Sequence, residues 1–136
     1  MRRTSILIAV CMIAAISLVL YAQRDIMPVM KEVGPAFASM GKNIQGSAAG
    51  DAQKDAEKLQ ALFKETGAFM KAQKQDKAVS WATEASDMAG EIAKAAKAND
   101  MAAAGATSKS LQNACKTCHD VHREQLPDKS YKYKAP

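Results

Sequence analysis

The sequence Cys115-Lys116-Thr117-Cys118-His119, close to the C-terminus, is the most informative part of this chain. In a helix, residues three and four positions apart project from one face, so both cysteines and the histidine would stand together. Two thiols at this spacing can form thioethers to the edge of a porphyrin, and the imidazole that follows can bind the iron. The pattern is typical of the attachment of a c-type haem.

Two other uses of a Cys-x-x-Cys pair fit this sequence less well. A thiol–disulfide redox motif needs a strand followed by a helix, and no strand-like alternation precedes Cys115. A structural zinc site needs four ligands, whereas the only other histidine, His122, lies one turn away without a second cysteine pair. Haem attachment is therefore the preferred interpretation.

The N-terminal segment has the pattern of an export signal. Arg2 and Arg3 precede an uncharged apolar run over residues 6–20, in the order typical of secretory signals. We expect a signal peptide over residues 1–22, cleaved after its last residue. Leu20 is bulkier than the small residue usual three positions before such a cut. An uncleaved membrane anchor is therefore the alternative, although the run is short for a bilayer span.

Export would leave a mature chain over residues 23–136, the length of one domain. Cys11 falls within the signal, so Cys115 and Cys118 are the only cysteines left for chemistry. Covalent haem attachment takes place outside the inner membrane, so we expect a periplasmic protein. The signal carries two of the 19 basic residues and none of the 14 acidic ones, which lowers the net charge from +5 to +3. The scattered bases give no indication of nucleic-acid binding.

The composition after the signal favours helix throughout, because alanine, lysine, glutamate, glutamine and methionine are common and β-branched residues are few. Turn residues divide the chain into four segments, and Pro127 should stop the last one. The pattern predicts an all-α antiparallel four-helix bundle, a fold that holds cofactors between facing helices. The expected helices cover about residues 25–44, 51–73, 77–98 and 101–125.

Several single residues should shape these helices. Asp25, Asp51 and Asp100 are each placed to cap the start of a helix. Pro35 lies inside the first helical pattern, so we expect a bend near Gly34-Pro35. Because the stripes are rich in alanine, the core is modest, and the chain without haem should be poorly folded.

With a haem motif on the last of four helices, the chain resembles the cytochrome c prime family (class II c-type cytochromes), nearer its low-spin, Met-ligated members. The resemblance is carried by the motif at residues 115–119, by Arg123 four residues beyond it, and by Met30-Lys31 followed by Gly34. The rest of the match is only helix order and length. One departure is Ile26, where family members often have an arginine.

The resemblance implies a role for several residues. His119 would be the proximal iron ligand, with one haem held through the two cysteines, and Arg123 would lie near the haem. Met30 is the candidate for the distal iron ligand, and Phe37 would line the same pocket. Met27 is the rival of Met30, and either methionine could instead be part of the apolar stripe.

The distal residue divides the family by function. Members with methionine there are six-coordinate and look like electron carriers, whereas members with an apolar residue are five-coordinate and bind nitric oxide or carbon monoxide. With Met30 in that place, we expect an exported one-electron carrier and not an enzyme. The alternatives are a gas-binding protein and a haem subunit anchored in a membrane complex.

The partners implied are redox proteins of unknown identity, and many relatives form homodimers. Lys129, Lys132 and Lys134 lie in the tail over residues 128–136, which is either a docking patch for such a partner or simply solvated. His122 should fall toward the interior and serve in packing.

Overall fold

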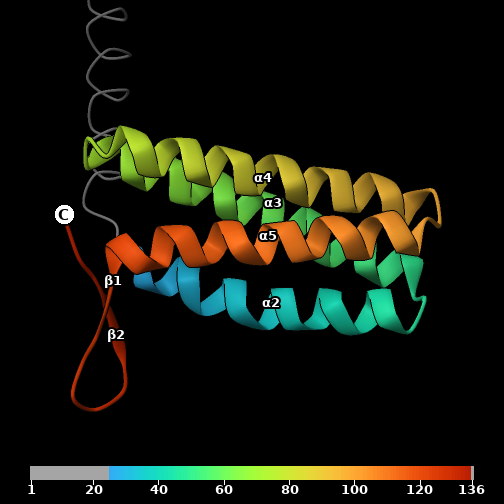
Figure 1. The fold of residues 1–136 in the computed structure, drawn as a ribbon, viewed down its shortest axis with the longest axis horizontal. Coiled ribbons are helices and arrows are strands. Elements are labelled where there is room, and N and C mark those ends of the chain that lie inside the picture. Colours follow the sequence, from blue (N-terminus) through green and yellow to red (C-terminus); the bar gives the residue numbers. More distant parts are fainter. Residues whose placement is uncertain (1–24, 136) are drawn as a thin grey trace, which may run out of the picture.

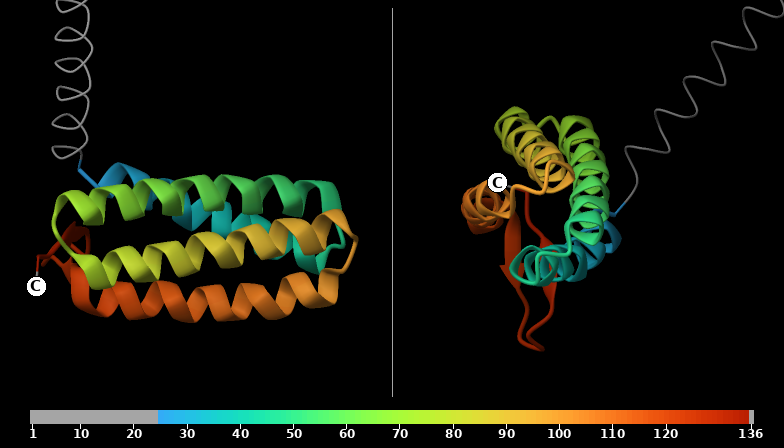
Figure 2. Two further views of the ribbon diagram at one scale, coloured as in Figure 1. Left: turned by 90° about the horizontal axis from the view of Figure 1, so that it is seen from above. Right: turned by 90° about the vertical axis from the view of Figure 1, so that its right-hand side faces the viewer.

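The protein is described here from a computed structural model that covers residues 25–135; the predicted signal peptide over residues 1–22 lies outside this range. The chain forms four long helices and a two-stranded sheet. The helices run antiparallel to their neighbours in one bundle, which confirms the all-α four-helix prediction (Figures 1 and 2). They are α2 (Met27–Gln45), α3 (Ala49–Ala72), α4 (Asp76–Lys97) and α5 (Met101–His122).

The three connections between helices share one structure. Ser47, Lys74 and Asn99 each follow a helix with a positive φ, at 55°, 57° and 59°. At the first of them the Ala48 N–H donates to the Asn43 carbonyl, and the other two connections repeat this bond. This is the Schellman motif, which satisfies the last helical carbonyls and turns the chain back within three residues.

The helix starts differ in part from the expected caps. The Asp100 carboxylate accepts from the Ala103 N–H at 2.9 Å, so this cap is confirmed. Asp51 is not a cap, because α3 begins two residues earlier and Ala48 occupies the cap position. Asp25 accepts from the Met27 N–H at 3.0 Å but lies one residue before the cap.

Helix α2 continues through Pro35 as a single element. The bend expected there stays a prediction. The buried stripe of α2 is formed by Val29, Val33, Ala36 and Met40, which face the other helices.

Helices α3 and α4 are in the most extensive contact, and among neighbouring helices in the bundle α2 and α5 have the smallest contact. Alanines on α4 bring its backbone close to α3, and the Ser86 hydroxyl donates to the Gln60 carbonyl across this interface at 3.4 Å. The largest fully buried side chains are Met40, Leu59, Ile92 and Leu111, one from each helix.

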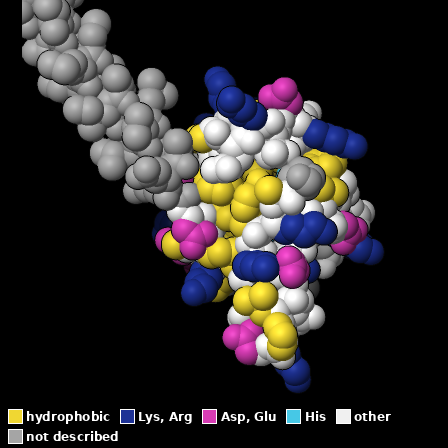
Figure 3. Space-filling model, turned by 90° about the vertical axis from the view of Figure 1, so that its left-hand side faces the viewer, with side chains coloured by type: hydrophobic (Ala, Val, Ile, Leu, Met, Phe, Trp, Pro, Cys, Tyr) yellow, Lys and Arg dark blue, Asp and Glu magenta, His cyan; other side chains and the backbone are white. Residues whose placement is uncertain are grey.

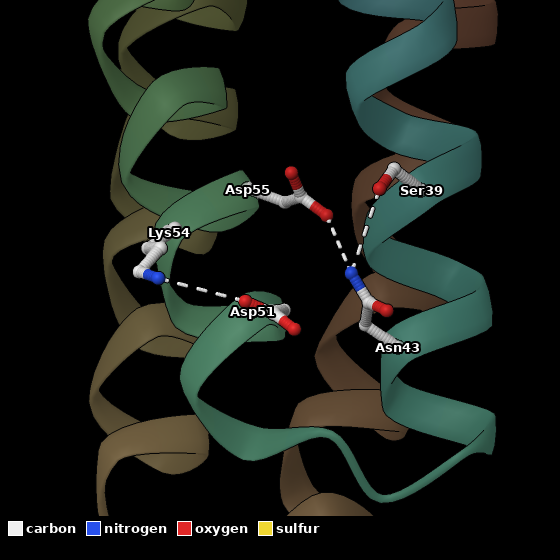
Figure 4. Close-up of polar contacts among 5 residues, drawn as sticks. All are labelled: Ser39, Asn43, Asp51, Lys54 and Asp55. Atoms are coloured by element: carbon white, nitrogen blue, oxygen red, sulfur yellow. Dashed lines mark hydrogen bonds and ion pairs between the residues drawn. The ribbon is translucent and has the colours of Figure 1, made fainter.

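Polar contacts fasten α2 to α3 near the turn that joins them (Figure 4). The Asn43 amide donates to the Asp55 carboxylate at 2.8 Å and to the Ser39 hydroxyl at 3.5 Å. The ion pair between Lys54 and Asp51 in the same view lies within α3 and is exposed to solvent.

The C-terminal segment corrects the sequence interpretation. The last helix was expected to reach Gln125, but α5 ends at His122 and the chain continues into a hairpin. Strand β1 (Arg123–Gln125) pairs antiparallel with strand β2 (Tyr131–Tyr133). The hairpin lies at the end of the bundle where α2 begins and α5 ends (Figure 1). The extra turn of helix is lost because its backbone groups find partners in β2. Over residues 25–135 no helix has the length and apolar character needed to cross a membrane.

Candidate functional site

A cavity of about 700 Å³ opens at the end of the bundle that carries the hairpin. All four helices and the hairpin contribute to its walls, and most of the lining side chains are apolar. Among the described residues of the lining there is no aspartate or glutamate, whereas Lys31, Arg123 and Lys132 are present. Seen from this end, hydrophobic side chains lie among lysine, arginine, aspartate and glutamate side chains (Figure 3).

The motif residues lie together on the wall that α5 supplies. Cys115, Cys118 and His119 all line the cavity and are half-buried, as their spacing on a helix predicts. The helix is regular here, and the Thr117 hydroxyl bonds the Asn113 carbonyl at 3.1 Å on its exposed side. The sequence motif is therefore a cluster in space.

The electrostatics of the motif favour neutral side chains. Burial raises the pKa of Cys115 to about 11, with a further contribution from Cys118, whose pKa is also raised by burial. Thiol–disulfide enzymes have the opposite arrangement, a cysteine with a lowered pKa. Burial also lowers the pKa of His119, and the charge of Arg123 lowers it further against an opposing effect of Asp120. A neutral imidazole is the form that binds a metal.

Helix α2 supplies another wall of the cavity. Met27, Met30, Gly34 and Phe37 line it together, and both methionines are partly buried rather than packed away in the core. Met40, in contrast, is fully buried and absent from the lining. Met27 and Met30 of α2 thus border the same space as His119.

The hairpin end of the cavity is formed by an aromatic cluster. His122 is 6% exposed, packs edge-on against Trp81 at 6.2 Å between ring centroids, and stacks on Tyr133 at 5.8 Å. Tyr133 in turn meets Phe69 edge-on at 5.2 Å. The expectation that His122 serves in packing is thus consistent with its contacts. Arg123 lines the cavity, with its guanidinium carbon 4.3 Å above the ring of Tyr131.

Sequence reasoning missed part of this lining. Trp81 is given no role in the sequence analysis, and Tyr133 falls within the tail over residues 128–136. The signal for Tyr133 was present in the turn residues Asp128 and Ser130, where the Asp128 carboxylate accepts from both the Ser130 N–H and its hydroxyl. The lining residues from α3, which were given no role in the site, are Phe63, Thr66 and Met70.

The described residues fit a covalently bound haem. The cavity lies within the size range of cofactor pockets, and its walls are mostly apolar. Two thiols and an imidazole border it from α5, which is the donor set that attaches haem. The Tyr133 hydroxyl is buried, and no hydrogen-bond partner for it occurs in residues 25–135.

Comparison with known proteins adds no assignment. The chain matches no family model and none of the curated proteins.

In the described part of the chain, His, Cys, Asp and Glu side chains form no group of three or more that could hold a metal ion.

Proposed function

We propose that this protein is a mono-haem c-type cytochrome that carries single electrons. The observation that carries the proposal is that Cys115, Cys118 and His119 border one apolar cavity together with Met30. When bound, the haem supplies an iron that is reversibly oxidised and reduced by one electron. The protein residues attach it, orient it and keep water away.

The two cysteines hold the haem through thioether bonds, and His119 is the proximal ligand. The raised pKa of Cys115 supports attachment as the use of these thiols, because it leaves little thiolate for disulfide exchange at neutral pH. The charge of Arg123 lowers the pKa of His119, and Arg123 lines the same cavity. It is therefore placed to contact the haem edge.

Met30 is the distal ligand in this proposal, and Met27 is its rival. A thioether ligand favours reduced iron and raises the reduction potential, which suits electron transfer. Phe37 lines the same wall of the cavity as Met30 and would limit the access of water to the iron.

The test is the visible spectrum of the reduced protein with and without carbon monoxide, on the wild type, Met30→Ala and Met27→Ala. We expect a low-spin spectrum that carbon monoxide leaves almost unchanged in the wild type and in Met27→Ala. Met30→Ala should be high-spin and take up the gas. The Met27 variant is the matched control, because both methionines are partly buried on one helix and line one cavity.

Other outcomes would point elsewhere. A wild type that is already high-spin and gas-reactive would contradict ligation by Met30 and favour the binding of nitric oxide or carbon monoxide. Gas uptake by Met27→Ala alone would make Met27 the ligand. A protein without covalent haem would end the proposal.

The proposal includes a periplasmic location and redox proteins as partners. Both depend on the segment over residues 1–22, which lies outside the described residues. The mass of the N-terminus of the protein from its native cell tests this point: cleavage after residue 22 gives a periplasmic carrier, and an intact N-terminus gives a membrane-anchored one.

A further inference from the structure

The cavity opens to solvent along one seam of the bundle. Its exposed lining residues come from α2, α5 and the hairpin, whereas those from α3 and α4 are buried or half-buried. Helices α2 and α5 also have the smallest contact among neighbouring helices, and Figure 1 shows the hairpin at their end. The mouth of the cavity therefore lies between α2 and α5, and its exposed residues include Lys31, Gly34, Gln112, Arg123 and Lys132.

The mouth carries positive charge. Lys31, Arg123 and Lys132 are cationic, and no aspartate or glutamate occurs among the described lining residues. The hairpin adds Lys129 and Lys134, which are both exposed. These charges come from the beginning and the end of the described chain, and the fold brings them together at the mouth.

The neighbouring carboxylates do not cancel this charge. Glu32 of α2 pairs with Lys58 at 3.2 Å, so its charge is directed toward α3. Glu124 pairs with Lys132 at 3.5 Å, and both side chains are about half exposed. With Asp128, the hairpin and Lys31 carry five positive side chains against two carboxylates. The balance stays positive even when the two propionates of a haem are counted.

This inference rests on the proposed function, which puts a one-electron haem in the cavity. We propose that the mouth between α2 and α5 is the docking site of the redox partner, and that this partner presents an acidic protein surface to it. The haem iron is oxidised by one electron while the cofactor of the partner is reduced by one, or the reverse. No bond forms, and no proton is transferred.

Charge complementarity selects this partner. Opposite charges on two proteins speed their encounter and fix their relative orientation, which electron transfer needs because the two cofactors must come close. The mouth is the side where a partner can come near the contents of the cavity, since α3 and α4 close the other walls with buried and half-buried residues. An anionic lipid surface could meet the projecting hairpin, but a flat surface does not enter a recess between two helices.

The test measures how fast the reduced, haem-loaded protein is oxidised by two small reagents of opposite charge. They are hexacyanoferrate(III), an anion, and tris(phenanthroline)cobalt(III), a cation. The double variant Lys31→Gln, Lys132→Gln removes two positive charges from the mouth. The matched control is Lys94→Gln, Lys97→Gln, which removes the same charge from exposed positions in the last turn of α4. That turn lies at the other end of the bundle from the hairpin (Figure 1).

We expect the rate with hexacyanoferrate(III) to fall about tenfold in the mouth variant at an ionic strength of about 10 mM. The rate with the cobalt(III) complex should rise. A change in reduction potential alone would move both rates in the same direction. At about 1 M salt, where charges are screened within about 3 Å, the variant should approach the wild type. The control variant should stay close to the wild type throughout.

A second measurement uses poly-L-glutamate as a probe for an acidic protein surface. Calorimetry should show that it binds the haem-loaded wild type and the control variant, and that the mouth variant binds it several-fold more weakly. Vesicles of phosphatidylcholine with phosphatidylglycerol serve as the lipid probe. Failure of poly-L-glutamate to bind would overturn the inference. Binding of the vesicles in its place, weakened by the mouth variant, would overturn it in favour of a membrane surface.

The failures of the two proposals can be told apart. A haem-loaded wild type that reacts with both reagents without dependence on salt would overturn the docking site and leave the cytochrome proposal standing. Equal effects of the mouth and control variants would do the same, because only the net charge of the protein would then matter. A wild type without covalent haem, as measured by mass spectrometry, would overturn both.

Discussion

The rings of His122 and Tyr133 lie parallel within 6°, with their centroids 5.8 Å apart. His122 is the last residue of α5, and Tyr133 is the last residue of β2. This contact therefore joins the helix that carries Cys115, Cys118 and His119 to the second strand of the hairpin. The position of the hairpin along the cavity depends on it.

Replacing His122 by alanine should loosen the hairpin. The variant loses the stack on Tyr133, the edge contact with Trp81 and the Nδ1 contact with the Lys134 carbonyl. We expect the free energy of unfolding to fall by about 2–4 kcal/mol, from truncation of a buried ring and loss of aromatic pairs. Urea unfolding of the two proteins measures this. His122→Phe should recover most of the loss, and an alanine variant as stable as the wild type would contradict the role.

The Tyr133 hydroxyl should make stability depend on pH in the alkaline range. Burial raises its pKa above the ordinary value of 10, with a smaller contribution from Cys118 that haem attachment would remove. The folded protein then holds this proton more tightly than the unfolded chain does. The associated stability is complete below about pH 10 and is lost as the pH rises through the raised pKa.

The measurement is the difference in unfolding free energy between the wild type and Tyr133→Phe from about pH 8 to about pH 11. This difference removes the titration of the lysines, which both proteins share. The difference in unfolding free energy should be constant near the lower end of this pH range. Near the upper end, the wild type should lose stability relative to Tyr133→Phe. A constant difference over the whole range would mean that burial of the hydroxyl does not perturb its pKa.

Removing the Asn43 amide should weaken the bundle away from the cavity. In Asn43→Ala the Asp55 carboxylate loses a hydrogen bond of 2.8 Å, and the tie between α2 and α3 is lost. We expect a loss of about 1–2 kcal/mol by thermal unfolding. Lys54→Ala, which breaks only an exposed ion pair in the same region, should change stability by less than about 0.5 kcal/mol. Equal effects would contradict the importance of the part-buried hydrogen bond between Asn43 and Asp55.

The double variant Cys115→Ala, Cys118→Ala tests how far the fold depends on what fills the cavity. Without the attachment bonds, the walls of a cavity of about 700 Å³ would lose their contacts with the bound group. We expect a loss of at least about 3 kcal/mol, the typical cost of one large truncation in a core. Circular dichroism should show reduced helix at room temperature. A full helix signal in the haem-free variant would show that the four helices pack well on their own.

Glycine-to-alanine changes in the helices should divide by the space around each glycine. A Cβ at Gly105 of α5 would lie 3.7 Å from the Ile44 Cγ2, an ordinary contact, so Gly105→Ala should add about 0.5–1 kcal/mol through helix propensity. A Cβ at Gly90 of α4 would collide with the amide of Gln60. Gly90→Ala should therefore gain less or lose stability, as a comparison of thermal midpoints would show.

The sequence predicted the four helices well because their signals are local. Apolar spacing, the helix-breaking turns and the cap at Asp100 all act within a few residues. The helix-terminal details were harder to predict. Asp51 looked like a cap, yet only three residues separate α2 from α3, so Ala48 both closes the first Schellman motif and opens the next helix.

The candidate site was predictable where helical spacing brings residues together. Cys115, Cys118 and His119 lie on one face, and Met30 and Phe37 border the same cavity from α2. The hairpin was missed because it depends on distant contacts. Local propensity predicts a helix that continues to Gln125. In the structure, β1 instead pairs with a strand that begins six residues after β1 ends, and Tyr133 of that strand packs on Phe69 of α3.

The antiparallel course of four helices brings the start of α2 and the hairpin after α5 to the same end of the bundle (Figure 1). The cavity therefore has its first wall at the beginning of the described chain and its last wall at Tyr133, near the end. Translation proceeds from the N-terminus, so the lining of this cavity is complete only after Tyr133 has been added. A message truncated by as little as the hairpin would still encode the cysteines and His119, but the product would present them in a pocket open on one side.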